Sequence, residues 1–408
     1  MMRIGIDVRY LSHGLVGGVH TYIKHFVPAL IELAPEHQIY LYADTKRPFE
    51  LKALPEHVTV RYFPWKNPAS SVGNDFLMWQ QMERDKLDVA HFPANYGFGP
   101  RQARIVITLH DAINILPMPE IIRGHPKNPR TIAMMTYLHV CSKAALRRAD
   151  LLITASEHAR REIAAVGRID LQKIVAVHHA PTPDMGRVTE PARLDAVRHS
   201  YELSRPFVLA DGLKNPVVLV RAWRRLPAAL RASRQIVFFA RRPDVLPIVH
   251  EAVKEGHARL LVRPSRADLI ALYSMAEAFV FPSWIEGFGI PVLEAMICGA
   301  PVIAADNSAI PEVAGGAALL ANAEDDATIA QHITRVLTDP AAALRFRELG
   351  YARAAQFSWR SAAQRILDCY YQAMQFHPSD DSTGTQAARS HEPSRSDKIT
   401  TPLAGAVK

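Results

Sequence analysis

Apolar and polar residues alternate in blocks along the first half of the chain, a pattern that predicts a sheet covered by helices. Short apolar runs predict strands, and segments with helical spacing lie between several of them, at 20–33, 131–148 and 156–166. The strands are expected at Arg3–Asp7, 38–42, 88–92, 104–109, 150–154 and 173–177. Alternation at this length favours an α/β fold with a parallel sheet and helices on both of its faces.

The same pattern starts again in the second half, so we expect two domains. Strands are expected at 206–210, 236–240, 259–262, Ala278–Phe281 and 301–305. We predict a first domain over 1–183, a polar, proline-containing linker over 184–204 and a second domain over 205–356. Two Rossmann-like domains of this kind bind ligand where the carboxyl ends of their strands face each other.

The end of the chain differs from both domains. Phe357, Ser358 and Trp359 precede an amphipathic run, which predicts a terminal helix within 357–376. Residues 377–408 are rich in Ser, Asp, Thr and Arg and contain few large apolar side chains, so we expect a disordered tail.

Composition narrows the class of protein without identifying its activity. With 408 residues, 49% hydrophobic and 22% charged, the chain is typical of a globular protein with sizeable cores. No apolar run reaches the roughly 18–20 residues that cross a membrane, and the N-terminus lacks a signal-peptide pattern. Three cysteines lie far apart, which argues against a disulfide framework and favours a reducing, cytoplasmic location.

The formal net charge of +8 indicates an anionic partner or simply a soluble basic protein. Basic residues cluster within 123–148 and 221–242, where solvated helix faces and a peripheral contact with the inner membrane surface are both open interpretations. Basic residues are not interleaved with aromatic ones, so we expect no nucleic-acid partner. No cluster of His, Asp or Glu has metal-ligand spacing, so we expect no metal cofactor.

The segment 281–304, FPSWIEGFGIPVLEAMICGAPVIA, carries the clearest candidate chemistry. Glu286 and Glu294 are separated by seven residues that include the turn Gly287-Phe288-Gly289. The glycines let the backbone approach a ligand closely, and the proline after Ile290 suits the first turn of a helix, whose free N–H groups favour phosphate. Each carboxylate can accept hydrogen bonds from neighbouring hydroxyls. The pattern favours a phosphorylated, hydroxyl-rich ligand, and an ordinary strand–helix turn with a solvated acid is the alternative.

This segment resembles the signature of retaining, nucleotide-sugar-dependent glycosyltransferases of family 4, which have the GT-B fold. The signature is Glu, seven residues and Glu within EGFG-x-P-x-x-EA-x-x-x-G-x-PV, and it is intact here down to Gly299, Pro301 and Val302. The resemblance implies that Glu294 binds the nucleotide ribose and that Glu286 lies at the hydroxyls of the donor sugar.

The resemblance has further implications for the turn and for the end of the chain. The amides of Phe288, Gly289 and Ile290 are implied to lie near the sugar and the diphosphate. The terminal helix that follows the Phe-Ser-Trp sequence is implied to cross back to the first domain. No metal is required in this family, and the nucleotide diphosphate sugar is a co-substrate.

His110 follows the strand expected at 104–109, at the edge where α/β folds bind ligands. From the residues alone, a loop histidine beside a capping Asp111 is the simpler interpretation. The resemblance implies that His110 faces the donor sugar. There it would bind the sugar or stabilise developing charge, and it would not remove a proton.

Gly17 and Gly18 precede the helix that we expect from about His20. They resemble the family's N-terminal glycine loop, which is implied to lie near the diphosphate and the acceptor, and a surface loop is the alternative. Glu312, in IPEVAGG, is expected to open a further helix.

Lys214, in VLADGLKNP, matches the family's Lys-Asn after the first strand of the second domain. The implied role of Lys214 is a point charge on the donor diphosphate. The turn before it is shorter than in relatives and lacks the arginine that often precedes the lysine. Arg241 or Arg242, after the strand expected at 236–240, is the candidate replacement.

These features predict a retaining glycosyltransferase that moves a hexose from a nucleotide diphosphate sugar to a saccharide or lipid-linked acceptor, in cell-surface polysaccharide or glycolipid synthesis. The N-terminal patterns IGID, GGVHTY and TLHDAI resemble mannosyltransferases, so mannose is the first candidate. The alternatives are a GT-B sugar-nucleotide epimerase or hydrolase, and a non-catalytic subunit that binds sugar nucleotides. A dinucleotide-dependent dehydrogenase is disfavoured because no G-x-G-x-x-G follows the first strand.

Overall fold

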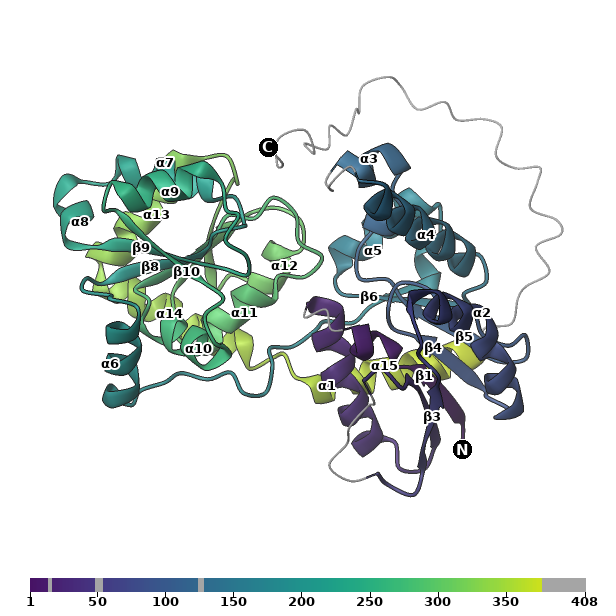
Figure 1. Ribbon diagram of the computed structural model, residues 1–408. Helices are drawn as coiled ribbons and strands as arrows, with labels where there is room; N and C mark the ends of the chain where they lie inside the picture. Colours follow the sequence, from purple (N-terminus) through teal and green to yellow (C-terminus); the bar gives the residue numbers. More distant parts are fainter. Residues whose placement is uncertain (14–16, 48–53, 124–127, 376–408) are drawn as a thin grey trace, which may run out of the picture.

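A computed structural model describes residues 1–13, 17–47, 54–123 and 128–375 (Figure 1). The predicted disordered tail, 377–408, lies outside the described residues. Among the helices described, none combines the length and the apolar character that a membrane crossing requires.

The first domain is built on a seven-stranded parallel sheet in the order β3-β2-β1-β4-β5-β6-β7. Its strands are β1 (Arg3–Asp7), β2 (Gln38–Asp44), β3 (Val58–Phe63), β4 (Val89–Phe92), β5 (Arg104–Thr108), β6 (Leu151–Thr154) and β7 (Ile174–Ala176). Its helices are α1 (Gly18–Leu33), α2 (Pro68–Arg84), α3 (Met118–Arg123), α4 (Pro129–Leu146) and α5 (Glu157–Gly167), with short 3-10 turns at Arg9–His13, Ile113–Ile115 and Leu171–Lys173.

The second domain repeats this plan around a six-stranded parallel sheet in the order β10-β9-β8-β11-β12-β13. Its strands are β8 (Phe207–Asp211), β9 (Gln235–Ala240), β10 (Ala258–Val262), β11 (Ala278–Phe281), β12 (Val302–Ala305) and β13 (Ala318–Ala321). Its helices are α6 (Pro191–Ser200), α7 (Pro216–Arg225), α8 (Ala228–Ser233), α9 (Pro247–Lys254), α10 (Arg266–Met275), α11 (Ile290–Ile297), α12 (Ile310–Ala314), α13 (Asp326–Thr338) and α14 (Pro340–Ala354).

Helices cover both faces of each sheet, which explains why the central strands are almost continuously apolar. Every residue of β9 and of β11 is buried, as expected for parallel strands that face helices on both sides. Two strands were not anticipated from the pattern. β3 is only partly buried at the sheet edge and mixes polar with apolar residues, and β13 is only four residues long.

The segment between the domains is more structured than its polar composition suggested. The predicted linker, 184–204, contains α6, which packs on α10 and is tied to it by an ion pair of 2.6 Å between Arg193 and Asp268. Val197 and Leu203 are buried in the core of the second domain. The burial of two apolar side chains fixes this part of the connection to that domain.

The last described helix, α15 (Trp359–Gln375), follows the second domain in sequence but belongs to the core of the first. It packs along α1, and Figure 1 shows it in yellow beside the purple helix α1. Trp359, Ile366 and Tyr370 are among its buried residues, and the Trp359 indole N–H donates to the carbonyl of Pro181 at 2.9 Å. The chain therefore crosses between the domains twice.

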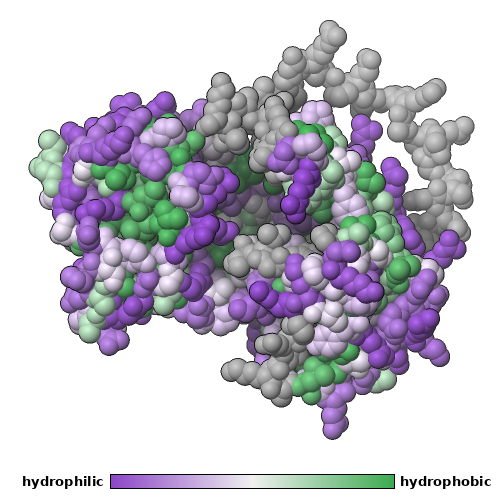
Figure 2. All heavy atoms as spheres, in the orientation of Figure 1, coloured by the Kyte–Doolittle hydropathy of each residue, from purple (hydrophilic) through white to green (hydrophobic). Residues whose placement is uncertain are grey.

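The strand order places a ligand-binding edge in each domain. The order reverses between β1 and β4 in the first sheet and between β8 and β11 in the second, and ligands of open α/β sheets bind at such points, beyond the carboxyl ends of the strands. The surface is recessed between the two domains (Figure 2).

Candidate active site between the domains

Lys214 and Glu286 meet at the point where the strand order of the second sheet reverses. Lys214 follows β8, Glu286 follows β11, and these two strands are neighbours. Lys214 Nζ lies 2.7 Å from Glu286 Oε1, and the Glu286 side chain is 15% exposed. Ser283 also donates its hydroxyl to Glu286 Oε1 at 2.7 Å. The structure thus brings together two of the predicted donor-binding residues, which lie 72 positions apart in the sequence.

The glycine turn after Glu286 lies directly against the first domain. A Cβ at Gly287 would be 2.9 Å from the carbonyl oxygen of His110, so a side chain at this position would push the two domains apart. The hydroxyl of Ser156 in the first domain donates to the Gly287 carbonyl at 2.8 Å. The motif residue and the predicted histidine therefore lie side by side across the interface.

Gly289 lies where the turn ends and helix α11 begins. Its φ of +102° is in the region that favours glycine, and it is the N-cap of α11, whose first residue is Ile290. No side chain caps this helix end, so its first N–H groups and the positive end of its dipole are available to an anion.

Glu294 lies one turn further along α11 and is almost buried. Its Oε1 pairs with Nη1 of Arg266 at 2.8 Å. Arg266 is the first residue of α10, and it also contacts Thr182 and Asp184 in the segment between the domains. Sequence reasoning had not paired Glu294 with an arginine, because Arg266 lies 28 positions away at the start of another helix.

His110 is held as a neutral ring of defined orientation. Its Nε2 lies 2.9 Å from the Pro93 carbonyl, and because a carbonyl only accepts, Nε2 carries the proton. Burial lowers the pKa of His110 to about 4. Nδ1 is therefore an unprotonated acceptor near neutral pH. The adjacent Asp111 accepts from the N–H of Ile113 at 2.9 Å, but the N-cap of the 3-10 turn that follows is Ala112, so Asp111 is not the capping residue that the simpler interpretation expected.

A chain of rings joins His110 to the glycine turn. His179 stacks on Tyr22 with ring centroids 4.8 Å apart and contacts His110 at 5.4 Å. On its other side His179 meets Phe288 at 5.4 Å. Phe288, predicted as a donor-loop residue, thus buries its side chain between the domains. His178 and His179 were missed, although their place after β7 follows the same strand-end rule that selected His110.

The shortened turn before Lys214 is braced from two sides. Asn215 adopts a left-handed conformation with φ of 50°. Its side-chain amide donates to the carbonyls of Pro282 at 3.0 Å and Ala323 at 2.8 Å. The side chain of Asp211 accepts from the N–H of Leu213 at 2.9 Å. This bracing fixes the backbone from which Lys214 reaches Glu286.

The two candidate replacement arginines differ in their surroundings. Arg242 pairs with Asp244 at 3.4 Å. Arg241 leaves β9, which neighbours β8, and its charge acts on the carboxyl of Asp211 together with that of Lys214. Burial nevertheless raises the pKa of Asp211. Arg241 is therefore the better placed of the two to add positive charge beside Lys214.

Gly17 and Gly18 lie at the start of α1, two residues before the predicted start. Gly17 is the N-cap with an extended backbone, and Gly18 is the first helical residue. A Cβ at either position would meet nothing within 4 Å, so packing does not require glycine there. Further along α1, His25 lies close enough to Arg266 and Asp184 for their charges to act on its pKa, which burial lowers to about 4.

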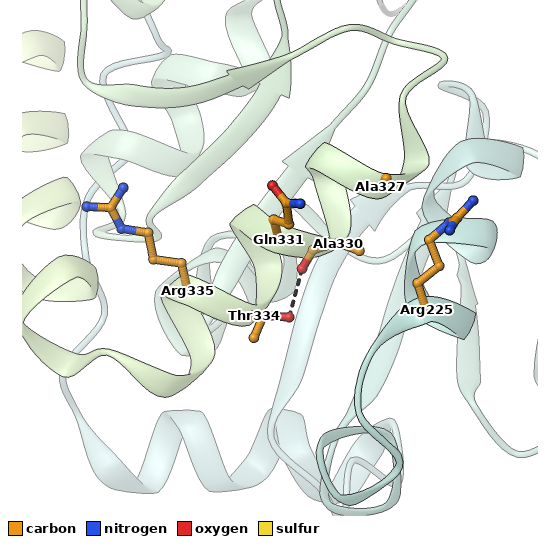
Figure 3. Close-up of a pocket in the computed structure, with 6 residues that line it drawn as sticks. All are labelled: Arg225, Ala327, Ala330, Gln331, Thr334 and Arg335. Atoms are coloured by element: carbon orange, nitrogen blue, oxygen red, sulfur yellow. Dashed lines mark hydrogen bonds between the residues drawn. The ribbon is translucent and has the colours of Figure 1, made fainter.

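A hollow on the second domain lies away from these residues. It is formed by α7 and α13 and is lined by Arg225, Ala327, Ala330, Gln331, Thr334 and Arg335 (Figure 3). Arg225 pairs with Asp326 at 2.9 Å, and the Thr334 hydroxyl donates to the Ala330 carbonyl at 2.8 Å. None of the motif residues lines it. In the described part of the chain, no group of three or more His, Cys, Asp or Glu side chains is arranged to hold a metal ion.

Comparison with known proteins identifies the family to which this chain belongs. The model of glycosyltransferase family 4 matches residues 16–181, and that of glycosyl transferases group 1 matches residues 210–353. The chain is 33% identical over 300 residues to O-antigen chain mannosyltransferase B of Escherichia coli, covering 70% of this chain and 75% of that protein. The chain is a group 1, family 4 glycosyltransferase.

Solved structures agree with this assignment at the level of the fold. Sucrose-phosphate synthase from Thermosynechococcus elongatus aligns with a TM-score of 0.64 at 19% identity, over 91% of this chain and 99% of that one. HepE from Anabaena in complex with UDP-glucose aligns with a TM-score of 0.63 at 16% identity, over 91% and 100%. The glycosyltransferase has the GT-B fold, as the family resemblance implied.

Proposed function

We propose that this glycosyltransferase moves a hexose, with mannose as the first candidate, from a nucleotide diphosphate sugar to a saccharide or lipid-linked acceptor, with retention at the anomeric carbon. The observation that carries the proposal is the meeting of Glu286, Lys214 and the Gly287 turn with His110 across the domain interface. The named mannosyltransferase relative and the UDP-glucose complex of a structural neighbour support the sugar and the donor class.

The two acidic residues exchange partners when the donor binds. Lys214 releases Glu286 for the sugar hydroxyls and turns to the diphosphate, with Arg241 as the second cation and the N-terminus of α11 as the third positive element. Arg266 releases Glu294 for the ribose hydroxyls. Both carboxylates are already aligned by these pairs before the donor arrives.

Neutral His110 acts as a hydrogen-bond acceptor. Its free Nδ1 accepts from a hydroxyl of the donor sugar, while Nε2–H remains on the Pro93 carbonyl. The bond from the anomeric carbon to the diphosphate breaks, and the acceptor oxygen bonds to the same face. The acceptor proton passes to an oxygen of the departing diphosphate, so His110 is not required as a base.

The donor class is tested by thermal shift with UDP-, GDP- and ADP-sugars, followed by measurement of nucleotide diphosphate release with and without saccharide acceptors. We expect a stabilising shift with one nucleotide class and release that depends on acceptor. If no sugar nucleotide shifts the melting curve, the assignment of the donor site is wrong. Donor conversion without acceptor would instead favour an epimerase or hydrolase, and binding without turnover a non-catalytic subunit. Turnover that persists in EDTA would agree with the absence of a metal cofactor.

The first domain also presents a surface suited to an anionic membrane. On α2, Phe76 is 48% and Leu77 is 55% exposed, and on α4 Val140 is 57% exposed. A hydrogen bond from Tyr137 on α4 to Asp75 on α2 places the two helices together. α4 contains two basic and no acidic residues, whereas α2 contains two acidic residues and one basic residue, so the charge that complements anionic lipid lies on α4.

We therefore propose a cytoplasmic enzyme that contacts the inner membrane peripherally through α2 and α4. In a flotation assay we expect the protein to rise with vesicles containing anionic lipid and to remain in solution with zwitterionic vesicles. Leu77→Glu should abolish flotation while leaving donor binding unchanged. Equal flotation of this variant and the parent protein would contradict the assignment.

A further inference from the structure

Glu312 in the second domain caps a helix of the first domain. It lies in the first turn of α12, as its sequence context predicted. Its carboxylate, however, accepts from the backbone N–H of Glu157 at 2.9 Å and of His158 at 3.2 Å, the first two residues of α5. A carboxylate at a helix N-terminus satisfies free donors and interacts favourably with the helix dipole.

The same carboxylate has a third partner in the first domain. His178 Nε2 lies 2.6 Å from Glu312 Oε1, and the Glu312 side chain is 22% exposed. Burial alone would raise the pKa of Glu312, but the hydrogen bonds from His178 and the two amides lower it. Arg353 of α14 donates to the Glu312 carbonyl at 2.6 Å and so fixes α12 to its own domain. We call these contacts of Glu312 with α5 and His178 the interdomain clasp.

The clasp lies next to the residues that face each other across the site. Ser156, the N-cap of α5, donates to the Gly287 carbonyl, and Gly287 lies so close to His110 that an added Cβ would be 2.9 Å from the His110 carbonyl oxygen. His178 contacts Phe288 with ring centroids 5.7 Å apart. Separation at the clasp would therefore move the glycine turn away from the first domain.

We propose that Glu312 is a positioning residue that holds the two domains in the arrangement in which His110 and Glu286 face the same donor sugar. It acts through α5 and the glycine turn and does not touch the donor. The proposal rests on the proposed function, because it assigns Glu312 to the reaction at that site. Loss of the clasp lowers the fraction of molecules in the closed arrangement without changing the donor-binding residues of the second domain.

The test compares Glu312→Ala with Glu348→Ala, which removes the same charge from an exposed position on α14. Small-angle X-ray scattering of each protein without ligand gives the radius of gyration. Calorimetry with UDP and GDP gives the dissociation constant, and release of nucleotide diphosphate gives kcat. For Glu312→Ala we expect a larger radius of gyration and a kcat reduced on the order of tenfold, as for the loss of a helix cap. The dissociation constant for UDP or GDP should stay within about twofold, because Lys214, Glu294 and the start of α11, which we propose bind the nucleotide, all belong to the second domain.

Glu312→Gln, which keeps one acceptor oxygen, should fall between the parent and Glu312→Ala, and Glu348→Ala should match the parent. Should Glu312→Ala not fold, His178→Gln carries the same comparison. An unchanged radius of gyration would overturn the clasp whatever the activity, and a parallel loss of nucleotide affinity would place Glu312 in the donor site instead. A larger radius of gyration for Glu312→Ala, with no turnover of any sugar nucleotide by the parent or a variant, would support the interdomain clasp. The same result would contradict the proposed reaction.

Discussion

At the scale of single residues, Glu294 is a buried carboxylate whose ligand-free partner is Arg266. For Glu294→Ala we expect nucleoside diphosphate binding to weaken by about 3 kcal/mol, because two hydrogen bonds to a charged acceptor are lost. The fold should survive, since the side chain of Arg266 is 37% exposed and keeps Asp184 as a partner. Calorimetry measures the affinity, and circular dichroism checks the fold.

Glu324→Ala is the matched control, because Glu324 is an exposed acid of the same domain. It should bind nucleoside diphosphate as tightly as the parent protein. Equal affinity of Glu294→Ala and the parent would refute the ribose role of Glu294.

Residue-scale reasoning located candidate residues where a local pattern carried the information, and their roles stay predictions. Glu286, Glu294 and the glycines form a contiguous motif, and Lys214 follows a strand, so each was found from the sequence. The partners of Glu312 were not found, because Glu157 and His178 lie 155 and 134 positions away and meet it only when the two domains pack. Contacts between domains impose no hydrophobic periodicity on either segment, so the sequence pattern does not reveal them.

At the scale of elements, the start of α11 depends on the backbone of Gly289. For Gly289→Ala we expect a loss of stability of about 1–2 kcal/mol, because a Cβ disfavours the left-handed region in which φ is +102°. Nucleotide affinity should fall as well, because the helix end that we propose as the diphosphate site would shift. Urea unfolding and calorimetry measure the two effects.

Gly73 is a control for this substitution, because an alanine there should stabilise the protein. It lies within α2, and a Cβ there would meet nothing within 4 Å. Gly73→Ala should therefore stabilise the protein by about 0.5–1 kcal/mol. A similar change in stability for the two variants would show that the conformation of Gly289 does not matter.

The helix α15 provides a second test at this scale. Ile366 is fully buried in the core of the first domain, so Ile366→Ala should destabilise the protein by about 2–5 kcal/mol. Arg360→Ala, at an exposed position of the same helix, should change stability by less than about 0.5 kcal/mol. Chemical unfolding followed by tryptophan fluorescence measures both, and equal midpoints would contradict the packing of α15.

Element-scale prediction was accurate for the central strands and weaker at the edges. β1, β8, β9 and β11 are apolar runs with both faces buried, so hydrophobicity alone located them. Edge strand β3 carries exposed and polar positions, and α6 has a single buried residue, so neither stood out from a polar loop. The family resemblance, not the pattern, indicated that the last helix returns to the first domain.

At the scale of the whole molecule, His91 is buried and His110 is half-buried, and both rings are neutral near pH 7. Burial lowers the pKa of His91 to about 3 and that of His110 to about 4. Between pH 6.5 and pH 4 the unfolded chain takes up protons at these positions and the folded protein does not. Stability should therefore fall as the pH drops through this window, by up to about 1.4 kcal/mol per pH unit for each such histidine.

Urea unfolding at pH 7.0, 6.0 and 5.0 measures this dependence. The half-buried carboxyls of Asp111 and Asp211, whose pKa values are raised by desolvation, act in the opposite sense but only where carboxyls titrate, towards the acid end. His91→Gln should flatten the slope between pH 6.5 and pH 5, while the exposed His250→Gln should leave it unchanged. A stability that is independent of pH over this range would contradict the neutral burial of these rings.

The position of α15 also bears on the order in which the molecule can form during synthesis. The apolar residues of α1 and of the first sheet that pack against α15 are synthesised early. α15 leaves the ribosome only after every described strand of both sheets. The nascent first domain must therefore keep an uncovered apolar strip while the second domain is translated, although N-terminal domains generally fold first. In this chain the second domain can therefore complete its core before the first. A chaperone that binds apolar surface would bind the first domain of the nascent chain, where α15 has yet to pack.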